Sequence, residues 1–352
     1  MPVLCKPAFE TPEYILTHDE TIQIAKRLHS DHPKFDVAMR MANNLGVQKR
    51  HLVRPLDEIL NPADFTTRNA IYEFEAKKRI PTVVEQALAN ANVTPEEIDA
   101  LVVVSCTGYL MPALTAWMIN TMKFRRNVVQ IPIAQMGCAA GGAAINRARD
   151  FCLAHRDVNV LIVSCEFCSL IYQPEDISVG NLLSNALFGD AIAAAVVRGE
   201  DAGGSTGGIK LVESGSHVIP DTEKHISYTM KNTGFHFNLS KGVSGHIQSM
   251  IPECQNLLKP LGWTMAEIDY CIFHAGGPKI LDVFRDYADV ADEKLNYSRE
   301  TLKNNGNVAS ACIYDVALRI FLDAPLAQGE RFLIAGFGPG ITAELTAGVW
   351  VN

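Results

Sequence analysis

The chain has 352 residues, a net charge of −8 and a hydrophobic fraction of 48%. This composition is typical of a globular protein and argues against a disordered or fibrous chain. Without a dense run of Lys or Arg, binding to nucleic acid or to an acidic membrane surface is not expected. No apolar stretch approaches the roughly 20 residues of a spanning helix, and neither a signal peptide nor a disulfide framework is visible among the nine scattered cysteines. We therefore expect a cytoplasmic protein.

The first quarter of the chain is predicted to be mainly helical. Residues 17–60 have the pattern of a helix, a loop and a second helix, with prolines as breaks. Residues 68–92 have helical spacing, and Pro81 predicts a boundary or a kink in that helix. The segment 94–97 carries a capping signal that predicts a short helical turn.

Three valine- and alanine-rich runs predict buried strands, at residues 100–106, 159–164 and 191–197. Continuous apolar runs of this length suit strands that are covered on both faces, as in parallel sheets. The glycine-rich segment 199–208 is the clearest linker candidate.

An internal repeat indicates that the chain is a duplicated α/β unit. Its matching elements lie about 170 residues apart, and alternating strands and helices predict mainly parallel pairing with right-handed crossovers. We therefore predict an N-terminal half at residues 1–205 and a C-terminal half at residues 206–352. The matching elements are Glu-Ile-Asp before a strand at 97–99 and 267–269, a helix start at 137–140 and 306–309, a strand at 160–164 and 332–336, and a final strand at 191–197 and near 345–351.

Candidate catalytic residues lie at the ends of these repeated elements. Cys138 and Asn307 open equivalent helices, and His274 ends a strand, which are the positions where sites gather in α/β sheets. A helix dipole and a nearby imidazole are expected to lower the pKa of the thiol, and a thiolate is a nucleophile for acyl transfer. His274 and Asn307 have the donors for an oxyanion site. The alternatives are a buried inert cysteine, a structural histidine and an Asn helix cap.

Motifs for metal and nucleotide cofactors are missing from the sequence. The pair Cys165 and Cys168 is a single CxxC, which does not suffice for zinc. The segment 336–340 does not fit the dinucleotide-binding pattern, and neither a P-loop nor HExxH occurs. We expect no metal and no redox cofactor.

Five motifs together resemble type III polyketide synthases of the chalcone synthase superfamily over essentially the whole chain. They are QMGCAAGGAAINRA around Cys138, NALFGDA around Phe188, HAGGPKIL from His274, GNVAS at Asn307, and GFGPGIT near the end. Within the superfamily, VSCTG, IVSCEFCSL, YQPEDISVG and GSHVIPDTE are most similar to bacterial 1,3,6,8-tetrahydroxynaphthalene synthases. Phloroglucinol synthases are the nearest alternative.

The resemblance implies a thiolase fold, with duplicated βαβαβαββ halves in αβαβα layers, and a homodimer. It implies iterative decarboxylative condensation of malonyl-CoA, as starter and extender, to a pentaketide that cyclises, with CoA thioesters as substrates and no cofactor. The residues it carries over are the catalytic Cys138, His274 and Asn307; Phe188 and Phe237 as gatekeepers between a CoA tunnel and the cavity; Cys106 and Tyr228 in the cavity; Met111 reaching into the partner's cavity; and Arg40, Gly276 and Gly277 at the CoA site.

The chain departs from the plant relatives at the CoA site. Of three basic positions on one helix only Arg40 remains, while Val37 and Asn44 occupy the other two. Lys49 and Arg50 are possible substitutes for the missing charges.

Other functions remain open at this point. A type III synthase that forms alkylpyrones is one alternative. A β-ketoacyl-acyl-carrier-protein synthase III shares the fold and the Cys, His and Asn set but needs a basic docking patch, which the sequence does not show. A non-catalytic acyl-CoA-binding protein on this fold is a third alternative, against which the intact set of Cys138, His274 and Asn307 argues.

Overall fold

A sheet of ten strands runs through the protein in a computed structural model that describes residues 1–203, 207–240 and 242–352. The strand order is β12-β13-β14-β9-β1-β8-β7-β5-β6, with β2 attached to β8. Because β1 pairs with both β8 and β9, it joins the N-terminal strands to the C-terminal ones. The strands are β1 (Val3–Leu4), β2 (Ala8–Glu10), β5 (Ala100–Val104), β6 (Val129–Ile133), β7 (Asn159–Phe167), β8 (Asp190–Arg198), β9 (Gly208–Val218), β12 (Tyr270–Phe273), β13 (Arg331–Gly338) and β14 (Thr342–Val351).

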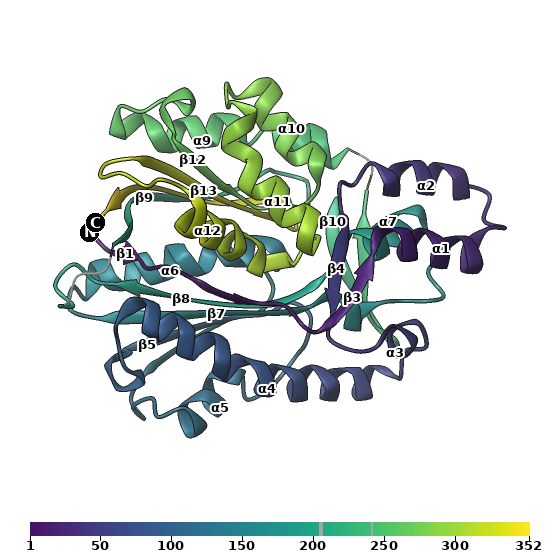
Figure 1. The fold of residues 1–352 in the computed structure, drawn as a ribbon, viewed down its shortest axis with the longest axis horizontal. Coiled ribbons are helices and arrows are strands. Elements are labelled where there is room, and N and C mark those ends of the chain that lie inside the picture. Colours follow the sequence, from purple (N-terminus) through teal and green to yellow (C-terminus); the bar gives the residue numbers. More distant parts are fainter. Residues whose placement is uncertain (204–206, 241) are drawn as a thin grey trace.

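Helices and sheet form alternating layers (Figure 1). Helices α6 and α12 lie between the two parts of the sheet, α4 and α5 cover the outer face of the N-terminal part, and α9 and α10 cover that of the C-terminal part. The helices are α1 (His18–His29), α2 (Phe35–Asn43), α3 (Leu56–Leu60), α4 (Phe65–Ala91), α5 (Leu114–Thr121), α6 (Ala140–Ala154), α7 (Val179–Leu187), α8 (Val243–Gln248), α9 (Ile251–Leu258), α10 (Pro278–Tyr287), α11 (Asn296–Asn305) and α12 (Cys312–Asp323).

The predicted duplication has a counterpart in the structure. Strands β5, β7 and β8 correspond to β12, β13 and β14, and α6 corresponds to α12. Even the capped turns before β5 and β12 match, since Thr94 and Thr264 each form a capping box with a glutamate three residues later. The predicted boundary between residues 205 and 206 falls outside the described residues.

The prediction of mainly parallel pairing is wrong. Pairs β5–β6, β5–β7 and β12–β13 are parallel, but β7–β8, β13–β14 and β9–β14 are antiparallel. Every residue of β7 and β8 is buried. A strand covered on both faces is continuously apolar in either direction of pairing, so its composition does not reveal that direction.

The N-terminal region also differs from the prediction. Residues 49–52, assigned to a helix, form β4 (Lys49–Leu52), which pairs with β3 (Tyr14–Thr17). Helix α4 continues through Pro81 without a boundary. Its residues Ile80, Val83 and Val84 are fully buried, and this packing offsets the one hydrogen bond that proline removes.

Candidate active site

Cys138 lies in a 3-10 turn (Gly137–Ala139) that leads directly into α6, and its side chain is half-buried. Gly137 has φ +50°, and a Cβ there would lie 2.6 Å from Cγ of Pro339. A Cβ on Gly338 would lie 2.5 Å from the backbone nitrogen of Ala139. The glycines of both motifs therefore allow the loop 336–340 to pack directly against the turn that carries the thiol.

Helix α6 approaches the Asn307 segment equally closely, at Gly141. A Cβ on Gly141 would lie 2.3 Å from the carbonyl oxygen of Ser310. Replacing a helical Gly by Ala usually stabilises a protein by up to about 1 kcal/mol, but here we expect the clash to dominate and Gly141→Ala to cost about 1–3 kcal/mol. Thermal unfolding measures the loss. Gly245→Ala on α8, where a Cβ meets nothing within 4 Å, is the control, and a stabilised Gly141→Ala variant would contradict the close packing.

Asn307 is held in position by its neighbours on both sides. Its backbone N–H donates to the carbonyl of Leu187 (2.9 Å), and its carbonyl accepts from the N–H of Gly189 (3.0 Å). The side-chain Oδ1 accepts the N–H of Ala309 (2.9 Å), so the amide nitrogen remains available as a donor. The Asn307 side chain hydrogen-bonds Cys138, a contact that acts to lower the pKa of the thiol.

His274 follows β12 in the C-terminal half, and the residue after it contacts Cys312. Its N–H donates to the carbonyl of Ala335 (2.8 Å), and the next N–H, of Ala275, donates to the sulfur of Cys312 (3.3 Å). Cys312 is close enough to Cys138 to contribute to the raised pKa of that thiol. The imidazole is buried, and its Nδ1 has no hydrogen-bond partner among the described residues.

Both groups are neutral at rest, which contradicts the expected thiolate. Burial first, and then the charge of Glu166, raise the pKa of Cys138 well above its ordinary value, and burial lowers the pKa of His274 to about 4. The contact with Asn307 acts to lower the pKa of Cys138, but by less than burial and the charge of Glu166 raise it. The expectation was wrong because it counted the dipole of the helix and left out the loss of hydration.

The lowered pKa of His274 makes stability depend on pH. The unfolded chain takes up this proton near pH 6.5 and the folded protein only near pH 4, so stability is full above about 6.5 and falls on acidification. We expect this residue to account for about 3 kcal/mol of lost unfolding free energy at about pH 4. Urea unfolding of wild type and His274→Gln at about pH 7 and pH 4 measures the contribution of His274 to the unfolding free energy, because the variant has no imidazole to protonate. Equal pH dependence in both proteins would contradict the assignment.

The four predicted cavity residues gather around Cys138. Cys106 packs with Cys168 and Ala309 in a buried cluster that Cys138, Phe188 and Tyr228 complete. The ring of Phe237 meets the rings of Phe188 and Tyr228 edge to face, at 5.2 and 5.6 Å between centroids. These aromatic side chains come from the end of α7 and from the β10 (Ile226–Lys231) and β11 (Gly234–Leu239) pair.

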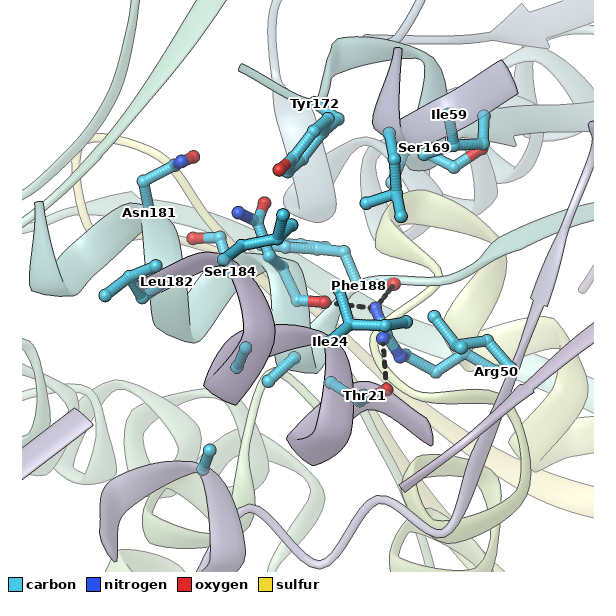
Figure 2. A pocket seen from close by; sticks show the side chains of 18 of the residues that line it. Thr21, Ile24, Arg50, Ile59, Ser169, Tyr172, Asn181, Leu182, Ser184 and Phe188 are labelled. Carbon is cyan, nitrogen blue, oxygen red and sulfur yellow. Dashed lines mark hydrogen bonds between the residues drawn. The ribbon is translucent and has the colours of Figure 1, made fainter. Parts of the chain in front are cut away.

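Phe188 and Phe237 also line a pocket of about 970 Å³, including its opening. Figure 2 shows its lining side chains from α1, from α7 and from the segment that follows β7. Most of the residues that line the pocket are apolar. One charged residue, Arg50, lies at its edge. Its Nη1 donates to the carbonyls of Phe188 (2.9 Å) and Asn185 (2.5 Å), and its Nη2 donates to Oγ1 of Thr21 (2.8 Å).

Arg50 therefore does not replace the missing basic residues of the CoA site. It is buried, and burial lowers the pKa of its guanidinium to about 10. A Cβ on Gly306 would lie 3.0 Å from its Cγ, so Arg50 packs between the Phe188 segment and the Asn307 segment. Its hydrogen bonds fix the backbone that carries both side chains.

The remaining predicted residues lie outside the cluster around Cys138. Met111 is 83% exposed, and Arg40 is exposed in the last turn of α2. Gly276 lies against His274, since a Cβ there would be 3.0 Å from Nε2. Gly277 directly precedes α10 as its N-cap, and a Cβ on it would meet nothing within 4 Å.

Sequence reasoning missed Glu166, a buried carboxyl group in β7. Its Oε2 accepts hydrogen bonds from the N–H of Cys106 (3.0 Å) and from Oγ1 of Thr107 (3.0 Å), and its Oε1 accepts from the hydroxyl of Ser310. No cation forms an ion pair with it among the described residues, and burial raises its pKa. An acidic residue inside an apolar strand was the available signal.

Within the described part of the chain, no group of three or more His, Cys, Asp or Glu is arranged to hold a metal ion. No helix in residues 1–203, 207–240 and 242–352 combines the length and the hydropathy that crossing a membrane requires.

Comparison with known proteins identifies the family. Residues 9–224 match the family model described as FAE1/Type III polyketide synthase-like protein, and residues 210–348 match the C-terminal domain of chalcone and stilbene synthases. A 1,3,6,8-tetrahydroxynaphthalene synthase of Streptomyces griseus is 53% identical, over 100% of this chain and 94% of that protein. A phloroglucinol synthase of Pseudomonas fluorescens is 42% identical over 99% of both.

Solved structures agree with this match. The crystal structure of 1,3,6,8-tetrahydroxynaphthalene synthase from Streptomyces coelicolor, described as a bacterial type III polyketide synthase, superimposes with a TM-score of 0.97 at 48% identity, over 99% of both chains. The layered, duplicated thiolase fold expected from the motifs is thereby confirmed. From sequence, site geometry and fold together, the chain belongs to the type III polyketide synthases.

Proposed function

We propose that this enzyme condenses malonyl-CoA, as starter and extender, to a pentaketide that cyclises to 1,3,6,8-tetrahydroxynaphthalene. The observation that carries the chemistry is the contact between the Asn307 side chain and Cys138, beside a cluster of aromatic side chains. The proposed product rests on the likeness to two relatives of that name, 53% and 49% identical over at least 99% of this chain.

Loading of the starter begins at Cys138. Its proton passes to His274, whose neutral imidazole has the free acceptor that this step needs. The sulfur attacks the thioester carbonyl, a bond from sulfur to the acyl carbon forms, and the bond to the CoA sulfur breaks. The proton then leaves with the CoA thiolate, and the acyl group remains on Cys138.

Extension uses His274 and Asn307 together. Hydrogen bonds from both side chains to the thioester oxygen of a second malonyl-CoA stabilise the enolate that forms as CO2 leaves. The enolate carbon attacks the acyl carbon on Cys138, the bond from that carbon to the sulfur breaks, and the Cys138 thiolate leaves. The chain, longer by two carbons, is then carried on CoA and returns to Cys138 by the same thioester exchange as the starter. The apolar surroundings of Phe188 and Phe237 favour neutral CO2 over a carboxylate.

The remaining predicted residues bind CoA, separate its pocket from the cavity, or shape the cavity. Phe188 and Phe237 separate the pocket of Figure 2 from the cavity, where Cys106 and Tyr228 shape the growing chain. Arg40, Gly276 and Gly277 contact CoA, and Met111, exposed as it is in one subunit, reaches the cavity of a second copy in a homodimer. The halves 1–205 and 206–352 supply the thiol and the two donors respectively, in a cytoplasmic enzyme that needs no cofactor besides its CoA substrates.

Incubation of the purified protein with malonyl-CoA alone tests this function. Mass spectrometry is expected to find tetrahydroxynaphthalene or its oxidised quinone, together with released CoA. Phloroglucinol as the product would favour the second candidate, which the 42% identical relative of that name supports. Absence of both CoA release and any aromatic product would reject the proposal.

A further inference from the structure

Another buried arginine, Arg68 on α4, forms no ion pair with any residue that the structure describes. The residue is 7% exposed. Its Nη1 donates to the carbonyls of Leu170 (3.1 Å) and Tyr172 (2.9 Å), and its Nη2 donates to the carbonyl of Thr233. Its Nε is buried and has no partner among the described residues. All the acceptors that Arg68 contacts in the described part of the chain are neutral. The Nε donor is therefore buried without a partner, and the positive charge of the guanidinium is buried without a carboxylate in contact.

The nearest negative charge does not neutralise Arg68. Asp64 is the residue whose charge acts to raise the arginine's pKa, yet burial outweighs it and lowers that pKa. The Asp64 side chain is engaged at the start of α4, where it accepts the N–H of Thr67 (2.8 Å). Arg50, in contrast, has the charge of Asp190 beside it. A buried guanidinium without a carboxylate is costly unless an anion binds to it.

Arg68 lines a small pocket beside the cluster around Cys138, and the space of this pocket together with the open solvent at its mouth is about 220 Å³. Thr107 in its wall follows Cys106, and the ring of Phe235 in its wall lies 5.9 Å from that of Tyr228. Ile171 lines both this pocket and the larger pocket of Figure 2. The full lining consists of Phe65, Arg68, Asn69, Thr107, Leu170, Ile171 and Phe235.

We propose that this pocket is a subsite for the terminal carboxylate of the acyl group on Cys138, with the guanidinium of Arg68 as its partner. The inference rests on the proposed function, in which a malonyl group is the starter. When the malonyl group moves from CoA to Cys138, the bond from its acyl carbon to the CoA sulfur breaks and a bond to the Cys138 sulfur forms. The carboxylate at the other end of the malonyl group takes no part, so the acyl group on the enzyme keeps a negative charge at its free end. Arg68 thereby selects a malonyl starter over a neutral one.

Competition between two starters tests the subsite. Wild type and Arg68→Gln are each mixed with equal amounts of malonyl-CoA and 13C-labelled acetyl-CoA and quenched within one turnover. The acyl groups on the peptide that contains Cys138 are then identified and quantified by mass spectrometry. The label separates added acetyl from acetyl formed by loss of CO2. We expect the malonyl-to-acetyl ratio to fall about 10- to 100-fold in the variant, as for loss of a hydrogen bond to a charged group. An unchanged ratio overturns the proposal.

Gln173→Leu is the matched control. The Gln173 side chain donates to the carbonyls of Thr233 (3.1 Å) and Phe235 (3.0 Å), so it holds the same β10–β11 turn as Arg68 but carries no charge. Its variant is expected to keep the wild-type ratio. The same fall in Gln173→Leu would show that a loosened turn changes the selection, and would also overturn the proposal.

A measurement on the wild type covers the case in which Arg68→Gln does not fold. Malonyl-CoA and its methyl ester, in which the carboxylate is masked, are compared as donors to Cys138. Loading from malonyl-CoA is expected to be at least about tenfold faster, and equal rates overturn the subsite. If wild type makes the naphthalene but shows no preference, only the subsite fails; if it loads no malonyl at all, the proposed function fails with it.

Discussion

Replacing Cys138 with Ala is expected to abolish polyketide formation from malonyl-CoA, with at least about a thousandfold loss in kcat/KM. Alanine fits the turn and keeps the fold, but it cannot carry an acyl group. His274 and Asn307 remain in place, so slow release of CO2 from malonyl-CoA is expected to persist. Product formation is followed by mass spectrometry and CO2 release by a radiolabel.

Cys152→Ala is the control for that experiment. Cys152 lies on the same helix, α6, and is buried, with its sulfur near the carbonyls of Val158 and Val197. Its replacement is expected to lower the unfolding temperature and leave kcat/KM near that of wild type. Undiminished polyketide formation by Cys138→Ala would remove Cys138 from the mechanism.

Asn307→Asp is expected to lower kcat/KM about 100- to 1000-fold while leaving the fold intact. The aspartate retains an oxygen that accepts the N–H of Ala309, the contact that orients Asn307. It loses the N–H donors that hydrogen-bond Cys138 and the enolate oxygen, and it adds a negative charge beside the site of the developing anion. Steady-state release of CoA, together with thermal unfolding, separates the loss of activity from a loss of stability.

The neighbouring Asn304 provides the comparison. Its side chain is half-buried, and the hydrogen bonds it donates within the described part of the chain go to Glu300, one turn earlier in α11. We expect Asn304→Ala to have wild-type activity. An Asn307→Asp variant that turns over as fast as Asn304→Ala would show that the amide donor is not needed.

The location of Cys138 at a helix start followed from local sequence, because glycines and a strand–turn–helix order are short-range features. Asn307 differs from the prediction, since it lies two residues before the corresponding turn Ala309–Ala311. The meeting of Cys138 and Asn307 required the duplication, which relates Gly137–Ala139 to the segment at Asn307 across about 170 residues. The roles of Phe188 and Phe237 came from family resemblance alone, and the structure adds that the two rings meet edge to face.

Features that depend on burial could not be predicted from local sequence. Arg50 looked like an exposed cation that could hold phosphates, yet its hydrogen bonds all go to residues far along the chain or on α1. The protonation of Cys138 had the wrong predicted direction, because the loss of hydration and the charge of Glu166 arise only when distant segments pack together. Pairing direction in β7 and β8 was hidden for a similar reason, since strands buried on both faces show no periodicity.

The most direct test of the mechanism is to locate the acyl group on the enzyme. Wild type is mixed with malonyl-CoA for less than one turnover, quenched in acid and digested with a protease. The masses of the peptides are then measured by mass spectrometry. We expect malonyl or longer polyketide groups on the peptide that contains Cys138, and none on that peptide from Cys138→Ala. Acyl groups on Cys106 or Cys168 instead, or polyketide release without any acylated Cys138, would contradict the account.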